Sequence, residues 1–504
     1  MARSLTNNFS LEYTSETSLG TAGETWVLLE PNSIGVFGAD ITTVSRTPIS
    51  KNRQRRKGTV TDLESTVDFE SDLTVDAFRD FIEGFAFASF TNADWHVQAG
   101  AGYRDLVAVA STDSFDHDAL SAGLVVGMMV KTYGFTNSVN NGTFLVKTGG
   151  STTSTLVTDT AGAAVSLLDE TPTQASGARM EICGVQGASA DITYDVDDTS
   201  VNSTALDFTT LGLTAGQFIH VGGTATANQF AGGVLRGRVV SVAATKVVLD
   251  KVVGTLSADD AGAGKKIELL FGQFLRNVDV DDASFLERSF TFEGTYADLD
   301  SAGVPEYDYS IGNYCNEIGM TLPLADKATV TYGFVGQDTN NPTVTREDHT
   351  NGTVVHQLTE AFNTSSDIIR LRITKVDETG LSTDFKSATV TFNNNVSGEK
   401  VLGYLGSKFL NTGIFEVNIE AQLLFTKGDV IDAIRANDTV TMDYIVRNND
   451  GAIAVDIPSM TMGGGAREFP VNETILISLT GEAFEDATLG TSMGVSQFPL
   501  YPTS

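Results

Sequence analysis

Apolar and polar residues alternate along much of the chain, with an apolar side chain at every second position. Clear cases are residues 388–392 (ATVTF) and 440–446 (VTMDYIV). Alternation with period two is typical of a strand that buries one face of a sheet. Turns containing Gly, Asn and Asp separate such segments, and Pro is scarce. The pattern predicts a mainly β fold with a few helices.

Two short segments follow helical spacing instead. Apolar residues recur at helical intervals from Val75 to Ile82, with Thr74 in front as a candidate N-cap. Asp429 stands in the same way before residues 430–435. Each segment predicts a short amphipathic helix whose apolar face covers one side of a sheet.

The segment that contains the first of these helices recurs later in the chain. Residues 69–79 (FESDLTVDAFR) align without a gap with residues 425–435 (FTKGDVIDAIR), and Asp76 meets Asp432 at an offset of 356. Residues 329–336 (TVTYGFVG) also align with residues 474–481 (TILISLTG), at an offset of 145. A strand, a helix and a closing strand therefore occur twice, which predicts a duplicated unit.

A second, unrelated pair of repeats interrupts the first unit, where Gly, Ala, Ser and Thr dominate. Residues 123–130 match residues 212–219 at an offset of 89, and later segments keep a similar offset. The short strands and turns predict two small inserted β-barrel or β-sandwich repeats that project from the surface of their host. The expected division is residues 1–98 and 273–365 for the first large unit, 99–185 and 186–272 for the inserted repeats, and 366–504 for the second large unit.

The charge of the chain is strongly acidic. Its 504 residues include 64 acidic and 32 basic ones, which gives a formal net charge of −32 and a pI near 4.3. Such a surface repels nucleic acid, although solubility alone would also explain it. Only Cys183 and Cys315 are present, and their separation predicts buried free thiols rather than a disulfide. No apolar run resembles a signal peptide or reaches the length of a membrane span, so no membrane anchor is expected.

Candidate chemistry is sparse. The five histidines form no recognised ligand pair, and His349 and His356 are interpreted as surface positions rather than metal ligands. The acidic segments at residues 191–198 and 279–282 do not match a calcium loop and are interpreted as solvated linkers, with cation binding as the alternative. We therefore expect no catalytic residue, no metal and no cofactor.

One basic cluster interrupts the acidic background. Residues 51–57 (KNRQRRK) lack the interleaved aromatic side chains of a site that stacks nucleic-acid bases. A flexible hairpin tip that adheres to an acidic neighbouring molecule is the favoured interpretation. The residues of this predicted contact between subunits or rings are Lys51, Arg53, Arg55, Arg56 and Lys57.

Taken together, residues 41–87 resemble the opening of major tail tube proteins of long-tailed, siphovirus-type bacteriophages. The shared order is a strand, a long basic loop, a strand and a short helix. The stretch from residue 388 is similar to the same unit with a different loop, residues 393–412. The resemblance implies two tandem β-sandwich or half-barrel domains, each with a short helix, whose sheets join around a ring. Stacked rings would form the virion tail tube through which the genome is ejected into the host.

This resemblance gives the acidic charge a purpose, because an acidic channel wall would not retain DNA. The candidate lumen-facing carboxylates belong to one strand of each unit, and an outer solvated face is the alternative for them. They are Asp62, Glu64, Asp68 and Glu70 in the first unit, and Glu416 and Glu420 in the second.

Family rings are commonly sixfold, so a chain with two tube units should close as a homotrimeric, pseudo-hexameric ring. Its expected partners are itself, other tail proteins at the tube ends, and double-stranded DNA that passes without specific binding. Assembly in the host cytoplasm would precede its place in the virion tail. The main alternative is a surface-layer or adhesin-type β-protein; a glycan hydrolase and a head or baseplate component are more distant ones.

Overall fold

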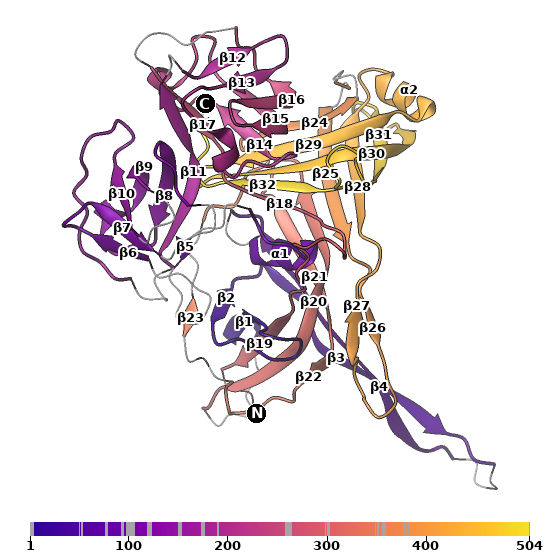
Figure 1. The fold of residues 1–504 in the computed structure, drawn as a ribbon. Coiled ribbons are helices and arrows are strands. Elements are labelled where there is room, and N and C mark those ends of the chain that lie inside the picture. The colour runs from indigo at the N-terminus through magenta and orange to yellow at the C-terminus, as the bar shows by residue number, and fades with distance from the viewer. Residues whose placement is uncertain are drawn as a thin grey trace.

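The computed structural model describes residues 5–502 with interruptions. The residues outside the description within this range are 50, 52–53, 76–78, 92–94, 97–105, 118–122, 150–153, 173–176, 189–190, 258–264, 298, 300–302, 348, 350–351, 355–358, 376–379 and 382–383. Strands dominate the described residues, as the alternating pattern predicted. They form a large curled sheet, a second sheet beside it and one small hairpin (Figure 1).

The large sheet has 17 strands, drawn from both ends of the chain. Its strands are β1 (Phe9–Ser15), β2 (Trp26–Leu29), β3 (Ser33–Arg46), β4 (Arg56–Asp72), β18 (Gln273–Arg276), β19 (Phe290–Tyr296), β20 (Glu306–Leu322), β21 (Thr329–Gly336), β22 (Asp338–Thr339), β23 (Thr353–Val354), β24 (Ile368–Lys375), β25 (Asp384–Asn393), β28 (Glu416–Leu424), β29 (Thr439–Arg447), β30 (Ala452–Glu468), β31 (Leu476–Ala483) and β32 (Gly494–Phe498).

One order of antiparallel pairing occurs twice in this sheet. The first series is β3, β4, β21, β20 and β19. The second is β25, β28, β31, β30 and β29, and the pairing of β20 with β25 joins the two series. We call residues 5–96 together with 273–354 the first half of the large sheet, and residues 359–502 the second half.

The positions of β-bulges show which residues of the two halves are equivalent more accurately than the sequence alignment does. The partner of β4 shifts after Ile34, which faces Phe69, and the partner of β28 shifts after Phe385, which faces Leu423. Because a bulge is a fixed irregularity of a ladder, it marks equivalent positions. Leu423 therefore occupies the position of Phe69, at an offset of 354. The gapless alignment with Phe425 was wrong by two residues, a shift that keeps every side chain on its predicted face.

A second pair of bulges agrees with this alignment. The ladder between β20 and β21 shifts after Cys315, which faces Phe334. The ladder between β30 and β31 shifts after Gly464, which faces Leu479. The offset from β21 to β31 is thus 145, as predicted from the sequence, and the offset from the end of β20 to the end of β30 is 149.

Two layers of strands enclose the main core. The 17-residue strands β20 and β30 each span both layers: the later part of each pairs with β21 or β31 in the first layer, and the earlier part with β19 or β29 in the second. Aromatic rings fill the space between the layers of the first half. Phe292 of β19 lies 4.8 Å from Phe334 of β21 and 6.2 Å from Phe69 of β4, measured between ring centroids.

Helices α1 (Arg79–Ala86) and α2 (Asp429–Ala436) pack into this core at corresponding places. The predicted start at Val75 was wrong, because Val75 lies in a turn, and residues 76–78 are outside the description. In α2, Gly428 is the N-cap and Asp429 is the first helical residue, whereas the sequence suggested a cap at Asp429.

The inserted stretch forms the second sheet, which has 13 strands and a core of its own. A pairing order again occurs twice: β11, β8, β9, β10, β7, β6, and then β17, β14, β15, β16, β13, β12. Pairing of β11 with β17 makes them one continuous sheet with a shared core rather than two separate barrels. Its strands are β5 (Trp95–His96), β6 (Leu106–Val109), β7 (Ser114–His117), β8 (Met128–Tyr133), β9 (Gly142–Thr148), β10 (Ser154–Thr158), β11 (Arg179–Ala188), β12 (Thr193–Asp195), β13 (Ser200–Asn202), β14 (Phe218–Val221), β15 (Leu235–Ala243), β16 (Lys246–Val253) and β17 (Lys266–Leu270).

The inserted sheet docks on the second layer of the second half. Arg238 of β15 donates to Asp456 of β30 at 2.9 Å and pairs with Asp250 at 2.6 Å. Phe218 lies among buried apolar residues of β29 and β30, and its backbone N–H donates to Ser496. Because the first and second layers lie on opposite sides of the core, the inserted sheet and the far face of the first layer are on opposite sides of this half.

Candidate assembly surface

The far face of the first layer carries a row of carboxylates. Residues directly opposite each other in an antiparallel ladder lie on the same face. Asp68 is opposite Gly333, which is opposite Glu317, then Asn393, then Glu416. We call the face that contains this row the open face; its polar side chains alternate with core residues such as Leu63 and Ile419.

All six carboxylates singled out from the sequence lie on the open face. The ladder between β4 and β21 runs without a shift from Ser65 to Asp72, which is the regularity that the prediction required. Further acidic side chains of this face were not predicted, although the same period-two argument would have found them. Among them are Asp40, Asp72, Glu317, Glu468 and Glu482.

Lysines neutralise only part of this charge. Lys400 forms ion pairs with Asp62 and, at 3.5 Å, with Glu64, and Lys327 pairs with Asp72 at 2.6 Å. The hydrogen bond from Lys400 lowers the pKa of Asp62. Partial burial raises the pKa of Asp68. The open face therefore keeps an acidic excess near neutral pH.

The first series of strands ends at an unpaired edge. Within the described residues, β3 pairs with β4 and with no other strand. Three of its large apolar side chains are about half exposed: Val36 at 48%, Ile41 at 52% and Val44 at 56%. An exposed edge with apolar side chains is a template for pairing with another chain.

The basic cluster lies at the tip of the hairpin formed by β3 and β4. This hairpin extends away from the body of the protein (Figure 1). Lys51, Arg55, Arg56 and Lys57 are exposed, as expected for a hairpin tip, and Arg53 is outside the described residues. We call residues 43–61 the first arm.

The corresponding excursion in the second half, residues 394–415, is folded back on the same chain. We call it the second arm; it contains the hairpin of β26 (Ser397–Glu399) and β27 (Phe409–Asn411). Its Leu410 is buried with Phe87 and Tyr314 of the first half. Backbone atoms of Ser407 and Lys408 hydrogen-bond to Gln337. The second arm therefore lies across the joint between β20 and β25.

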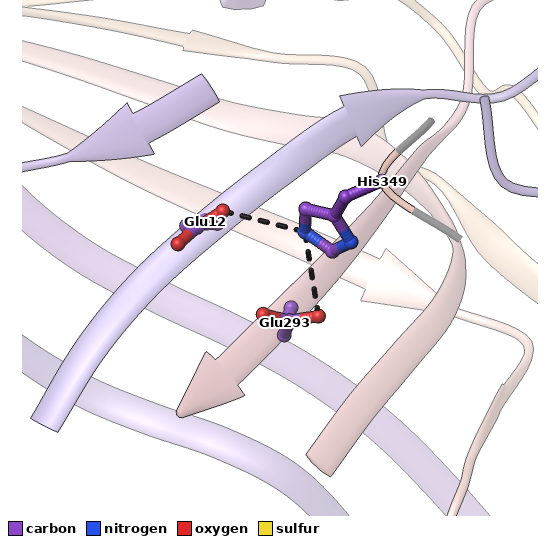
Figure 2. A group of neighbouring side chains, drawn as sticks. All are labelled: Glu12, Glu293 and His349. Carbon is purple, nitrogen blue, oxygen red and sulfur yellow. Dashed lines mark ion pairs between the residues drawn. The ribbon is translucent and has the colours of Figure 1, made fainter. Parts of the chain in front are cut away.

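A separate charged cluster lies on the second layer of the first half (Figure 2). Glu12 of β1 is directly opposite Glu293 of β19. His349 Nε2 lies 3.4 Å from Glu12 Oε2 and 3.6 Å from Glu293 Oε2. The imidazole stacks on Trp26 with a centroid separation of 4.5 Å, and its side chain is only 11% exposed. The interpretation of His349 as a surface residue was wrong, and His356 is outside the described residues.

These three side chains are of types that bind metals, and their ligand atoms lie within 4.8 Å of one another. Arg346 already bridges both carboxylates, at 2.9 Å from Glu12 and 2.6 Å from Glu293. A cation would have to displace this guanidinium, so the contacts favour a structural role. Three distant segments supply the cluster, and no local sequence pattern announces it.

The same position of the second half also holds a buried carboxylate bound by arginine. The bulges in the ladders β19–β20 and β29–β30 place Asp443 at the position of Glu293, and both side chains are fully buried. Arg370 and Arg372 bind Asp443. This agreement concerns polar groups, which the apolar pattern of the sequence does not reveal.

Other residues considered from the sequence have ordinary local roles. Asp191 accepts hydrogen bonds from Thr204 and Ala205, and Asp282 accepts one from Ser284, so these carboxylates stabilise turns. Cys183 and Cys315 are buried free thiols, as predicted.

Neither helix in the described part of the chain is long and apolar enough to cross a membrane. Among curated proteins, none matches the sequence. The model of a family described as phage tail tube protein matches residues 6–483, nearly the whole chain. A curled, mainly β sheet is consistent with such a protein. The chain thus belongs to the phage tail tube protein family.

Proposed function

We propose that this chain polymerises as stacked homotrimeric rings into the tail tube of a siphovirus-type phage. Each chain supplies two related units, so that three chains make a pseudo-hexameric ring. The support for duplication is the pairing order that occurs twice, with bulges at equivalent positions in both series. The expected domain ranges 1–98 with 273–365, 99–185, 186–272 and 366–504 belong to this proposal.

The open face forms the wall of the channel. The single observation that carries this assignment is the row across strands of both halves that contains the carboxylates of Asp68, Glu317 and Glu416, on the face opposite the packed core. Cationic side chains on such a wall would bind phosphates and retain DNA, whereas carboxylates do not. Screening over about 8 Å at physiological salt keeps the repulsion short-ranged, so DNA passes without specific binding.

The inserted sheet faces outward from the tube. Its docking on the second layer of the second half, away from the open face, supports this position. The protein assembles in the host cytoplasm, and other tail proteins bind the ends of the tube. Its role in the virion is structural.

Negative-stain electron microscopy of the concentrated, purified protein tests the proposal. We expect tubes, and top views of rings in which three chains give six similar inner features and three outward projections. A ring of six chains would contradict the stoichiometry. Particles without tubes or rings at any concentration would contradict the function itself.

A further inference from the structure

The joint inside the chain provides a template for the joint between chains. Residues 317–322 of β20 pair with residues 388–393 of β25, with Glu317 opposite Asn393 and Ile318 opposite Phe392. The core-facing side chains of this joint are all at most 4% exposed, so the two halves make a dry contact. They are Ile318, Met320 and Leu322 on β20, and Ala388, Val390 and Phe392 on β25.

Two of the three corresponding residues, just past the end of β30, are apolar and exposed, whereas the third, Arg467 at the position of Ile318, is charged. Extended past Glu468, the last paired residue of β30, the offset of 149 assigns Phe469 and Val471 the positions of Met320 and Leu322. Phe469 is 71% exposed and Val471 is 86% exposed. Apolar side chains in line with a core row, yet open to solvent, indicate a contact that one chain alone does not complete.

The edge of β3 has the complementary property. The offset of 351 from Ile34 to Phe385 places Ile41 at the position of Phe392. Phe392 is fully buried, whereas Ile41 is 52% exposed, because within the described residues β3 is paired on one side alone, by β4. The two uncovered edges are thus those that the internal joint would bring together if it were repeated between chains.

We infer that β3 of one chain pairs antiparallel with residues 466–471 of a second copy, in the register of the internal joint. Thr42 then lies opposite Ala466, and Ile41 lies opposite Arg467. This inference rests on the proposed ring and supplies its partner and register. Pro470 has no N–H and faces Gly38, so the ladder lacks one donor at that point.

The arms support the same partner through charge. The second arm places Lys400 on Asp62 of the first half. The offset of 354 makes Glu416 the counterpart of Asp62. The offset of 145 makes Glu482 the counterpart of Gln337, which hydrogen-bonds to the second arm. The first arm, with its lysines and arginines, then lies on these exposed carboxylates of the second copy. No other described part of the chain presents so many uncompensated positive charges beside an open strand edge.

Disulfide cross-linking of assembled tubes tests the pairing and its register. The test variant is T42C/A466C, because directly opposite residues of antiparallel strands come close enough for a disulfide. E317C/N393C is the matched positive control at the same positions of the internal joint. T42C/E468C is the register control, two residues away on the same face. The native Cys183 and Cys315 are buried and give little background.

We expect T42C/A466C tubes to give covalent dimers and closed trimers on a non-reducing gel, with about fivefold more product than T42C/E468C, since disulfides tolerate little displacement. E317C/N393C should cross-link without a change in the number of joined chains. Mixed single variants T42C and A466C should give dimers and no trimers, which shows that the bond is between chains.

Tubes of T42C/A466C that remain monomeric on the gel would overturn the inference while leaving the proposed function intact. A larger yield from T42C/E468C would also overturn it, because the register would differ from that of the internal joint. Absence of tubes or rings from the unmodified protein would instead defeat the proposed function, and the inference with it.

Discussion

Phe392 of β25 lies directly opposite Ile318 of β20, where the two halves of one chain meet. The position of Phe392 in the first half is held by Ile41, which is half exposed. Phe392→Ala should lower the unfolding free energy of the dispersed chain by about 3–5 kcal/mol, because it leaves a cavity in a packed core. Ile41→Ala should leave this free energy unchanged but raise the critical concentration for tubes about fivefold. Urea unfolding and sedimentation measure the two effects; equal loss of stability in both variants would contradict the assignment of Ile41 to an assembly contact.

The charge of the open face can be tested with Glu70→Lys and Glu420→Lys in one variant. We expect its tubes to retain double-stranded DNA added during assembly, with binding that falls steeply as salt rises, because cations on the wall release counterions from phosphates. Co-sedimentation measures the retained DNA. A variant with Asp197→Lys and Asp281→Lys, both exposed elsewhere, has the same net charge and should not retain DNA. Equal retention by both variants would show that Glu70 and Glu420 do not face the channel.

Arg238 anchors the inserted sheet, and its removal should be costly. Burial alone would lower the pKa of Arg238, but Asp456 and Asp250 raise it, so the guanidinium stays charged. Arg238→Met leaves Asp456 buried without its partner and should cost about 3–5 kcal/mol in urea unfolding. Lys246→Met breaks the more exposed pair with Asp198 and should cost at most about 1 kcal/mol. Similar costs for the two variants would mean that the Arg238 contact does not hold the sheet in place.

Gly84 allows α1 to approach β19. A Cβ added at Gly84 would lie 2.5 Å from Phe290 Cε2, whereas one added at Gly428, before α2, would meet nothing within 4 Å. Gly84→Ala should therefore destabilise the first half by about 1–3 kcal/mol through overpacking. Gly428→Ala should be tolerated, and thermal melting would compare the two. A neutral Gly84→Ala variant would mean that the helix shifts freely on the sheet.

The cluster around Glu12 predicts a dependence of stability on pH. Burial raises the pKa of Glu12, but the interactions with His349 and Arg346 lower this pKa by more than burial raises it. The net shift is therefore downward. A carboxyl with a lowered folded pKa adds stability above its unfolded pKa of about 4.3, and this stability is lost as pH falls through the folded pKa. Glu12→Gln should be less stable than the parent at pH 7, and the difference should shrink below about pH 4.3. Urea unfolding at several pH values measures it; a constant difference would show that the Glu12 carboxylate carries no such linkage.

Much of the architecture could be predicted from the alternation of apolar residues, because burial of one face requires it. Residues 388–392 and 440–446 lie within strands β25 and β29, and the parity of Asp62 and Glu64 gave the face that they share. The register between the halves was two residues off, because the sequence alone shows neither the strand pairing nor the bulges that mark equivalent positions.

The polar contacts of the second layer could not be predicted from the sequence for a different reason. Glu12, Glu293 and His349 come from segments up to 337 residues apart, and only the curled sheet brings them together. The first arm extends away from the protein and the second arm folds back on it, and this difference also depends on tertiary contacts. Nothing in residues 394–415 alone indicates that Leu410 is buried against Phe87.

The internal ladder between β20 and β25 has a kinetic consequence. Because both strands belong to one polypeptide, they meet at an effective concentration set by the chain itself, and dilution does not separate them. In the proposed trimeric ring, three contacts between molecules would close a circle that would need six if each unit were a separate subunit. Because the two units are encoded separately, their other edges can differ in sequence. The first arm can therefore carry a tip rich in lysine and arginine without any change in the second arm.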